Sequence, residues 1–478
     1  MSIRDNVRVC VPRYLQIGKG SLSQLPEIIK ILGSIKSPLI VTDKQMVQFG
    51  YVKKLQEVLN KAGLNSNVFD DTIPDPTDKV VLKGIDMLEK NKNDAVIGFG
   101  GGSPIDTAKA IAVLSQYSRD IQDYKPPGTF DKKGLPIIAI PTTAGTGSEV
   151  THHAVVIDSR TNNLEKISCR GEGFVPIVSI IDYELTLSKP RRLTIDSAID
   201  TLTHGIEAYV SKKATLFSDR MALDTIRLVT ENIYAVDKNP KDIKAREGLM
   251  LAATLGGLAF SNASICLVHG MSRPLGSNFK VPHGLSNAML LPTITEFSID
   301  HAKSRYADCS RAGNFAAPED NDDLACEKLI KGLYKINNDF EVPSMKAFGI
   351  NENGIDFFLK TIRKYEEYKK TLDEIAIKAL ENEDAIVKMD LNVSITKKEE
   401  VEISSQDSPK QILDRIKSAD SADSFMKAIG DIEKVLEGKD SVKKRTGFSL
   451  STQITELDNL SFLGILEGMQ IVLNKRIK

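Results

Sequence analysis

The stretch Asp94-Ala-Val-Ile-Gly-Phe-Gly-Gly-Gly-Ser-Pro-Ile-Asp-Thr-Ala-Lys109 decides the fold of the first half of the chain. Its apolar start predicts a strand, the glycines end that strand, and a helix is expected from Ser103 with Pro104 in its first turn. Glycine amides and a helix N-terminus suit the binding of phosphate groups. A plain glycine-rich turn is the alternative, because the spacing is not that of the GxGxxG dinucleotide motif.

Outward from this stretch, short apolar runs alternate with helical patterns from Val11 to about Asp182. This alternation predicts a doubly wound α/β domain with a mostly parallel sheet, which we assign to residues 1–187. The expected strands are 37–43, 67–70, 94–99, 135–141 and 151–158, and the expected earlier helices are 44–62 and 76–89, the second with Thr77 at its start.

Several polar residues follow the predicted strands. Asp43 is placed either to accept hydrogen bonds from an adenosine ribose, which favours NAD over NADP, or to cap the next helix. The hydroxyl-rich stretch from Pro141 to Thr151 either donates to ligand oxygens or forms a solvated turn. His152 and His153 are adjacent on a predicted strand, so we expect them to point to opposite faces and to be structural.

From Pro190 onward the pattern becomes helical, and we assign residues 188–395 to a helical domain. Glycine steps such as Leu255-Gly-Gly-Leu and the Pro282-His-Gly turn should separate or bend its helices. The expected helices are 194–211, 217–236, 245–260 and 264–278.

Four side chains in this half are candidate metal ligands. Asp200 and His204 are four residues apart, on one face of a helix, and His269 and His283 follow. One carboxylate and three imidazoles suit Fe(II) or Zn(II). On spacing alone, an Asp and a His four apart more often form a hydrogen-bonded pair on the surface.

Composition argues against several kinds of partner. The 478 residues carry a formal net charge of −1, so no attraction to nucleic acid or to an anionic membrane is expected. Five scattered cysteines without a CxxC pair indicate a reducing compartment, and no apolar run has the length of a membrane span. We expect a cytoplasmic protein that forms a homodimer or a higher homo-oligomer.

The sequence motifs in these stretches resemble those of the iron-containing (group III) alcohol dehydrogenases, and the resemblance extends from about Val11 to about residue 385. The resemblance implies a dehydroquinate synthase-like fold, with an α/β N-terminal dinucleotide-binding domain and an all-helical C-terminal metal-binding domain. The motifs that carry it are Gly-Gly-Gly-Ser-Pro-x-Asp-Thr-x-Lys, Pro-Thr-Thr-Ala-Gly-Thr-x-x-Glu-Val-Thr, Asp-x-Leu-Thr-His-x-Ile-Glu-Ala-Tyr, His-Gly-Met-x-x-Pro-Leu-Gly and Pro-His-Gly-x-x-Asn-Ala-x-Leu-Leu-Pro.

The resemblance also implies roles for single residues. The metal, Fe(II) with Zn(II) as the alternative, would be held by Asp200, His204, His269 and His283, which act in catalysis through it. Lys166 would lie near the nicotinamide ribose. The other residues implied to contact NAD are Asp43, Gly101, Gly102, Ser103, Thr142, Thr143 and Thr146. The implied activity is reversible hydride transfer between the nicotinamide and a small primary alcohol or aldehyde, with the metal as Lewis acid.

Two features depart from the family pattern. Many members carry a second histidine where this chain has Arg273, and an arginine cannot exchange a proton at neutral pH. Arg273 either binds a substrate carboxylate or a cofactor phosphate, or pairs with an acid on the wall of the cleft. Residues 396–478 resemble no family that we recognise, and we expect an appended, mostly helical tail.

Three other functions remain open at this point. A hydroxyacid–oxoacid transhydrogenase would turn over without added NAD. A metal-dependent hydrolase or lyase, such as a dehydroquinate synthase-type cyclase, would use the same site for different chemistry. A non-catalytic binding protein would act through the tail, although the intact glycine loop and the four candidate ligands argue against it.

Overall fold

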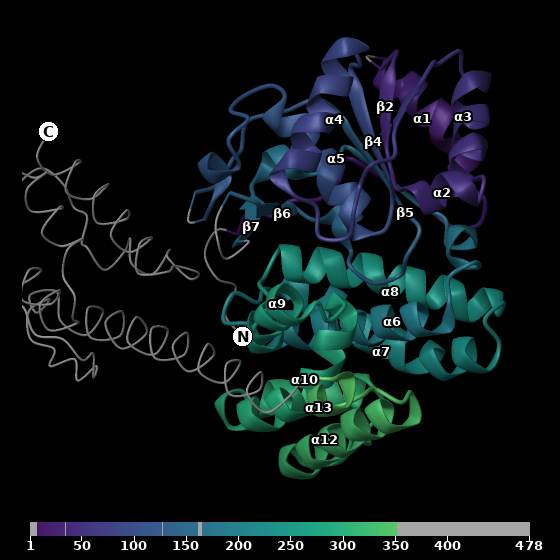
Figure 1. Ribbon diagram of the computed structural model, residues 1–478. Helices are drawn as coiled ribbons and strands as arrows, with labels where there is room; N and C mark the ends of the chain where they lie inside the picture. The colour runs from purple at the N-terminus through teal and green to yellow at the C-terminus, as the bar shows by residue number, and fades with distance from the viewer. Residues whose placement is uncertain (1–6, 34, 127, 161–164, 351–478) are drawn as a thin grey trace, which may run out of the picture. The chain divides into compact units, whose positions relative to one another are not determined.

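The computed structural model describes residues 7–33, 35–126, 128–160 and 165–350. Within them an α/β half is followed by a helical half (Figure 1). The tail expected over 396–478 lies outside the described residues, as does the end of the helical domain expected to reach residue 395. None of the described helices has both the length and the apolar character needed to cross a membrane.

The sheet of the α/β half is parallel, as predicted. Its order is β1, β8, β5, β4, β2, β3, and all neighbouring strands pair in parallel. The carboxyl ends of its strands therefore meet at one edge, where ligands of open α/β sheets bind. The bounds are β1 (Tyr14–Ile17), β2 (Pro38–Val41), β3 (Asn67–Phe69), β4 (Ala95–Gly100), β5 (Ile137–Pro141) and β8 (Val178–Ile181), with β6 (His153–Asp158) and β7 (Glu165–Arg170) forming a separate antiparallel pair.

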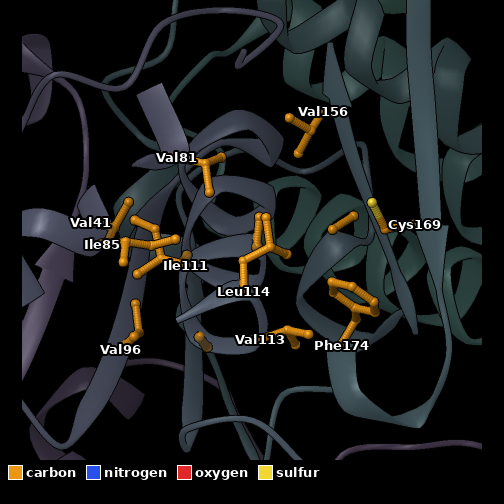
Figure 2. Close-up of a cluster of buried hydrophobic side chains, with 14 of the residues drawn as sticks. Val41, Val81, Ile85, Val96, Ile111, Val113, Leu114, Val156, Cys169 and Phe174 are labelled. Carbon is orange, nitrogen blue, oxygen red and sulfur yellow. The ribbon is translucent and has the colours of Figure 1, made fainter. Parts of the chain in front are cut away.

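Helices cover both faces of the sheet through two apolar clusters. Leu25 and Leu55 belong to the cluster on one face, and Ile85 and Ile111 pack with Val96 on the other (Figure 2). The strands are buried on both sides, which explains their continuous apolar runs. The helices are α1 (Leu25–Leu32), α2 (Lys44–Gln48), α3 (Tyr51–Lys61), α4 (Asp78–Lys90) and α5 (Gly102–Leu114), with 3₁₀ turns η1 (Ser21–Gln24), η2 (Ile121–Tyr124), η3 (Ser148–Val150), η4 (Glu172–Phe174) and η5 (Tyr183–Thr186).

The start and end of some helices differ from the sequence prediction. The single helix expected over 44–62 is wrong, because Gly50, at φ 75°, separates α2 from α3 in a conformation that glycine adopts freely. Thr77 caps α4, as predicted. Helix α5 begins at Gly102, one residue before the expected Ser103.

The helical half begins after η5 and is built around three long helices that pack on one another, α6, α7 and α8. Gly256 and Gly257 lie inside α8, so they do not separate two helices, which was one of the two roles expected for them. They serve a tertiary contact instead: a Cβ atom added at Gly147 would lie 2.5 Å from Cα of Gly257. The bounds are α6 (Arg191–Val210), α7 (Leu216–Lys238), α8 (Ile243–Ser261), α9 (Leu267–Phe279), α10 (His283–Ser298), η6 (Ile299–His301), α11 (Lys303–Ala312), α12 (Asp322–Asp339) and α13 (Met345–Phe348).

A buried lysine ties the glycine-loop helix to the segment that follows β5. Lys109 of α5 is fully buried, and its amine donates to the carbonyl of Thr151 (2.8 Å), to the hydroxyl of Thr151 (3.0 Å) and to the carbonyl of His153 (2.7 Å). Asp106 accepts from the amide of Val155 at 3.0 Å. Burial lowers the pKa of Lys109 to about 8, although the Asp106 carboxylate opposes this shift.

Replacing Lys109 with Met should destabilise the fold by about 3 kcal/mol, because buried carbonyls that lose their donor each cost roughly 1–3 kcal/mol. The measurement is the free energy of unfolding in urea. Lys83→Met removes an exposed lysine from neighbouring α4 and should change stability by less than about 0.5 kcal/mol. Equal effects of the two substitutions would contradict the structural role of Lys109.

Candidate functional site

Helices α6, α9 and α10 bring the three predicted imidazole ligands around one carboxylate oxygen of the fourth predicted ligand, Asp200. Oδ1 of Asp200 lies 3.5 Å from Nε2 of His269, 3.7 Å from Nε2 of His283 and 3.9 Å from Nε2 of His204. The ligand atoms of Asp200, His269 and His283 all lie within 4.8 Å of one another, whereas His204 stands outside that tighter group. The alternative suggested by spacing, a hydrogen-bonded Asp–His pair on the surface, is wrong because Asp200 and His204 are buried.

The residues present fit a divalent cation. The side chain of His269 is 4% exposed, and within the described part of the chain its Nε2 atom makes no hydrogen bond. A buried imidazole nitrogen without a partner is costly unless something binds it. One carboxylate oxygen and the imidazoles grouped around it are donors that Fe(II) and Zn(II) accept.

Two residues that sequence reasoning did not single out hold these ligands in place. Glu207 accepts a hydrogen bond from Nδ1 of His269 at 2.6 Å, which directs Nε2 toward Asp200. Asn287 donates to Oδ1 of Asp200 at 2.6 Å. Their spacing was a usable signal, because Glu207 follows His204 by three residues in α6 and Asn287 follows His283 by four in α10.

The charges in this cluster act strongly on one another. Burial alone would lower the pKa of His269, but the carboxylates of Glu207 and Asp200 outweigh it and raise that pKa to about 9. Burial would likewise raise the pKa of Asp200, but the surrounding imidazoles hold it well below its usual range. For His204 burial prevails and lowers the pKa to about 3. The position next to Nε2 of His269 therefore attracts positive charge.

Aromatic rings pack behind the cluster. The His204 ring stacks on Phe260 of α8 at a centroid distance of 4.4 Å and on the His269 ring at 4.7 Å. The prediction that His152 and His153 point to opposite faces is wrong, because their rings lie 4.2 Å apart. Strand β6 begins only at His153, so the alternation of a strand does not apply to His152 in the bend before it.

The glycine loop and part of the hydroxyl-rich loop meet, as their predicted common role requires. Gly101 is the N-cap of α5, and Gly102 and Ser103 form its first turn. A Cβ atom added at Gly102 would lie 2.9 Å from a methyl carbon of Thr146, and one added at Gly101 would lie 3.5 Å from the hydroxyl oxygen of Thr143. The backbone amides at the start of α5 thus lie beside threonine side chains.

Two of the other residues predicted to contact the cofactor have partners within the α/β half. Thr142 is fully buried, and its amide donates to the carbonyl of Gly100 at 2.8 Å, so its backbone adjoins the glycine stretch, whereas its hydroxyl donates to the sulfur of Met46 at 3.7 Å. Asp43 caps α2, where its Oδ1 accepts from the amide of Met46 at 3.0 Å. Capping, one of the two roles expected for Asp43, is therefore confirmed, and it engages one of the two carboxylate oxygens.

Lys166 of β7 reaches the helical half. Its amine pairs with Oδ1 of Asp75 at 2.9 Å and lies 3.3 Å from where a Cβ atom at Gly276 of α9 would be. Asp75, at φ 53°, was not singled out from the sequence. Arg273 follows His269 by one turn of α9 and lies close enough to β6 to add to the lowering, mainly by burial, of the pKa of His153.

A glycine loop at the edge of a parallel sheet, beside a carboxylate–imidazole cluster on helices in which Asp200, His204 and His269 are buried and His283 is exposed, defines a metal-dependent dehydrogenase as the class of protein. Comparison with known sequences agrees. The sequence model described as iron-containing alcohol dehydrogenase matches residues 12–183, and that of the C-terminal region of this family matches residues 194–386.

Individual relatives match most of the chain. NAD-dependent methanol dehydrogenase of Bacillus methanolicus is 34% identical over 351 residues, which are 73% of this chain and 91% of that protein. NADPH-dependent butanol dehydrogenase of Clostridium saccharobutylicum is 32% identical over 378 residues, 78% of this chain and 92% of that protein. The crystal structure of a 1,3-propanediol oxidoreductase superposes with a TM-score of 0.71 at 31% identity, covering 74% of this chain and 92% of that one.

The chain belongs to the iron-containing alcohol dehydrogenase family. This confirms the predicted family, fold class and enzyme class, and with them a metal-dependent, nicotinamide-linked oxidoreductase acting on alcohols and aldehydes. The matched residues end at 386, so the segment 396–478 lies outside the family match as well as outside the described structure.

Replacing Glu207 with Gln should weaken divalent-metal binding about 10–100-fold, the usual effect of losing a carboxylate that orients a ligating imidazole. Competition with a coloured chelator measures the affinity for Fe(II) or Zn(II). Glu231→Gln changes an exposed glutamate of α7 and should leave the affinity unchanged. Wild-type affinity in the Glu207→Gln protein would show that Glu207 does not support the ligands.

Proposed function

We propose that Asp200, His204, His269 and His283 hold the catalytic cation, Fe(II) with Zn(II) as the alternative. The observation that carries this proposal is the buried Nε2 atom of His269, which makes no hydrogen bond within the described residues and lies 3.5 Å from a carboxylate oxygen. When bound there, the cation supplies a Lewis acid for the oxygen of the alcohol or aldehyde.

Other residues of the chain orient the proposed ligands and exclude water from this centre. Glu207 fixes the orientation of His269, and Asn287 that of Asp200, so that the ligand atoms converge before any substrate enters. Phe260 covers one face of the His204 ring and excludes water from that side. Arg273 stands in place of a titrating histidine and cannot take the proton of the alcohol at neutral pH, so that proton would leave through water and the ribose hydroxyls of the cofactor.

We propose NAD as the cofactor. Gly101, Gly102 and Ser103 offer amides and the positive end of α5 to its pyrophosphate, and Thr143 and Thr146 lie beside them. Thr142 then acts by packing the loop on α2. Asp43 accepts from the adenosine ribose, and Lys166 donates to the nicotinamide ribose near the metal centre.

The substrate that we propose is a small primary alcohol or its aldehyde. The support is the chemistry of the relatives, which act on methanol, butanol and 1,3-propanediol by their names. These are short, uncharged molecules whose common feature is a terminal hydroxyl group. The protein's share in the reaction would be to hold the reacting carbon next to the nicotinamide, in an orientation that allows hydride transfer.

We propose a homo-oligomer in the cytoplasm. Edge strand β1 pairs, among the described strands, with β8 alone, and it exposes Leu15 and Ile17 (37% and 46%). Such an edge suits pairing with a second copy. Five free cysteines suit a reducing compartment. Sedimentation of the wild type as a dimer or larger, shifting to a monomer in Ile17→Lys, is the expected result, and a monomeric wild type contradicts it.

Activity should depend on the metal and on Asp200. In protein purified without oxygen and loaded with Fe(II), NADH oxidation should occur with short aldehydes. Asp200→Ala should lower kcat/KM by on the order of 10³-fold, since removing a Lewis acid's ligand forfeits several kcal/mol of transition-state stabilisation. Asp224→Ala, at an exposed aspartate of α7, is the matched control and should stay active.

Assays with a set of short aldehydes and oxoacids also distinguish the proposed dehydrogenase from the alternative functions. Full activity after removal of all metal would overturn the proposed centre. Turnover of a hydroxyacid with an oxoacid in the absence of added NAD would identify a transhydrogenase instead. Arg273→Ala, tested on acidic and neutral aldehydes, should shift the preference toward neutral ones if Arg273 binds a substrate carboxylate, and an unchanged preference rules that role out.

A further inference from the structure

The candidate metal centre is open at His283. The side chain of His283 is 47% exposed, whereas those of the other three proposed ligands are at most 4% exposed. Within the described part of the chain, a nicotinamide ring therefore reaches the centre from the His283 side, because hydride transfer requires the ring to lie next to the reacting carbon. The residues beside His283 are thus the ones that would face the nicotinamide end of a bound cofactor.

The ion pair of Asp75 and Lys166 lies beside the turn that leads into His283. The amine of Lys166 is 2.9 Å from Oδ1 of Asp75 and 3.3 Å from the position of a Cβ atom at Gly276, near the end of α9. That Cβ position is itself 3.7 Å from the carbonyl oxygen of Val281, which precedes His283 by two residues. These distances place the pair next to the open side of the centre.

The backbone holds Asp75 beside Lys166. The amide of Ile157 donates to the carbonyl of Pro76 at 2.8 Å, and Ile157 is the partner of Lys166 in the register of β6 and β7. Asp75 itself has a φ of 53°, a left-handed conformation that Asp and Asn adopt more readily than most other side chains. The pair is therefore built into the α/β half, and Asn can replace Asp75 without added backbone strain.

The two charges of this pair matter because the nicotinamide ring changes its own charge during hydride transfer. The ring carries one positive charge in NAD⁺ and none in NADH. An unpaired Lys166 beside the nicotinamide ribose would repel the ring of NAD⁺ and leave the neutral ring of NADH unaffected. The carboxylate of Asp75, which is 2.9 Å from the amine, offsets most of this repulsion.

We propose that Asp75 is a specificity-determining residue that sets the relative affinities for NAD⁺ and NADH by neutralising the charge of Lys166. This inference rests on the proposed cofactor site, in which Lys166 donates to the nicotinamide ribose. When the carboxylate is lost, the amine weakens the binding of the oxidised cofactor and not of the reduced one. By linkage, the ratio of the two affinities sets how readily the bound cofactor accepts a hydride.

The test compares the dissociation constants of NAD⁺ and NADH in the full-length protein loaded with Zn(II). NADH is followed by its own fluorescence, since the chain contains no tryptophan, and NAD⁺ by its displacement of NADH. Asp75→Asn should raise the ratio of the NAD⁺ constant to the NADH constant about tenfold, because a unit charge within about 10 Å acts on the ring through an effective dielectric constant of about 20. Asp75→Glu keeps the charge and should keep the ratio within about twofold of the wild type.

Lys166→Met should change the ratio in the opposite direction. It leaves the carboxylate of Asp75 uncompensated, which favours the positively charged ring, so the ratio of the NAD⁺ constant to the NADH constant should fall about tenfold. The double variant with Asp75→Asn carries neither charge, and its ratio should return to within about threefold of the wild type. Opposite signs that cancel in the double variant separate a charge effect from a loss of shape.

Asp71→Asn is the matched control. Asp71 lies in the same loop after β3, its side chain is 52% exposed like that of Asp75, and it pairs with Lys44 at 3.3 Å. The control should leave the ratio unchanged. The inference is overturned if Asp75→Asn changes both constants equally or neither, or if Asp71→Asn changes the ratio as much. A wild-type protein that binds neither nucleotide, or wild-type constants for both in Lys166→Met, would overturn the proposed cofactor site as well.

Discussion

The contact between Gly147 and Gly257 joins the sheet half to the helical half, and the geometry of the site depends on it. Gly147 has a φ of 62°, and a side chain at Gly257 would meet the backbone of Gly147 at 2.7 Å. The loop after β5 is thus pressed against α8 on one side, while Lys109 of α5 holds its end on the other. The glycine turn and the metal-ligand helices are thereby held in one arrangement.

The proposed metal centre is organised by electrostatics as much as by shape. Asp200 and Glu207 are buried, and His269 lies between them with a pKa of about 9. A cation that binds at Nε2 of His269 competes with a proton for that nitrogen, because a ligating imidazole must be neutral. Asn287 and Phe260 restrict the movement of the flanking ligands.

Much of this architecture is readable from the sequence because local rules govern it. The alternation of apolar runs and helical patterns gave the parallel sheet, and Thr77 marked the start of α4 since capping is a local interaction. The candidate metal ligands were predicted from the family's sequence motifs more than from spacing, because an Asp and a His four residues apart do not indicate which side chains of α9 and α10 lie next to them. The motifs alone give no distances between these side chains.

Other features depend on partners distant in sequence. Gly256 and Gly257 were predicted to interrupt a helix, because no residue near them in the sequence indicates that the loop at Gly147 packs on them. The strand expected from Thr151 begins two residues later, at His153, and this error changed the predicted direction of the His152 ring. The role of Asp75 depends on Lys166, which lies on β7, so it could not be found from the residues next to Asp75 in the sequence.

The distribution of the proposed metal ligands along the chain sets an order of events during synthesis on the ribosome. The last strand of the sheet ends at Ile181, before the first ligand, Asp200, and the final ligand is His283. The nucleotide half can thus begin to fold while the last imidazole is still to be translated. A cation held by all four proposed ligands can therefore bind only after His283 has been added to the chain.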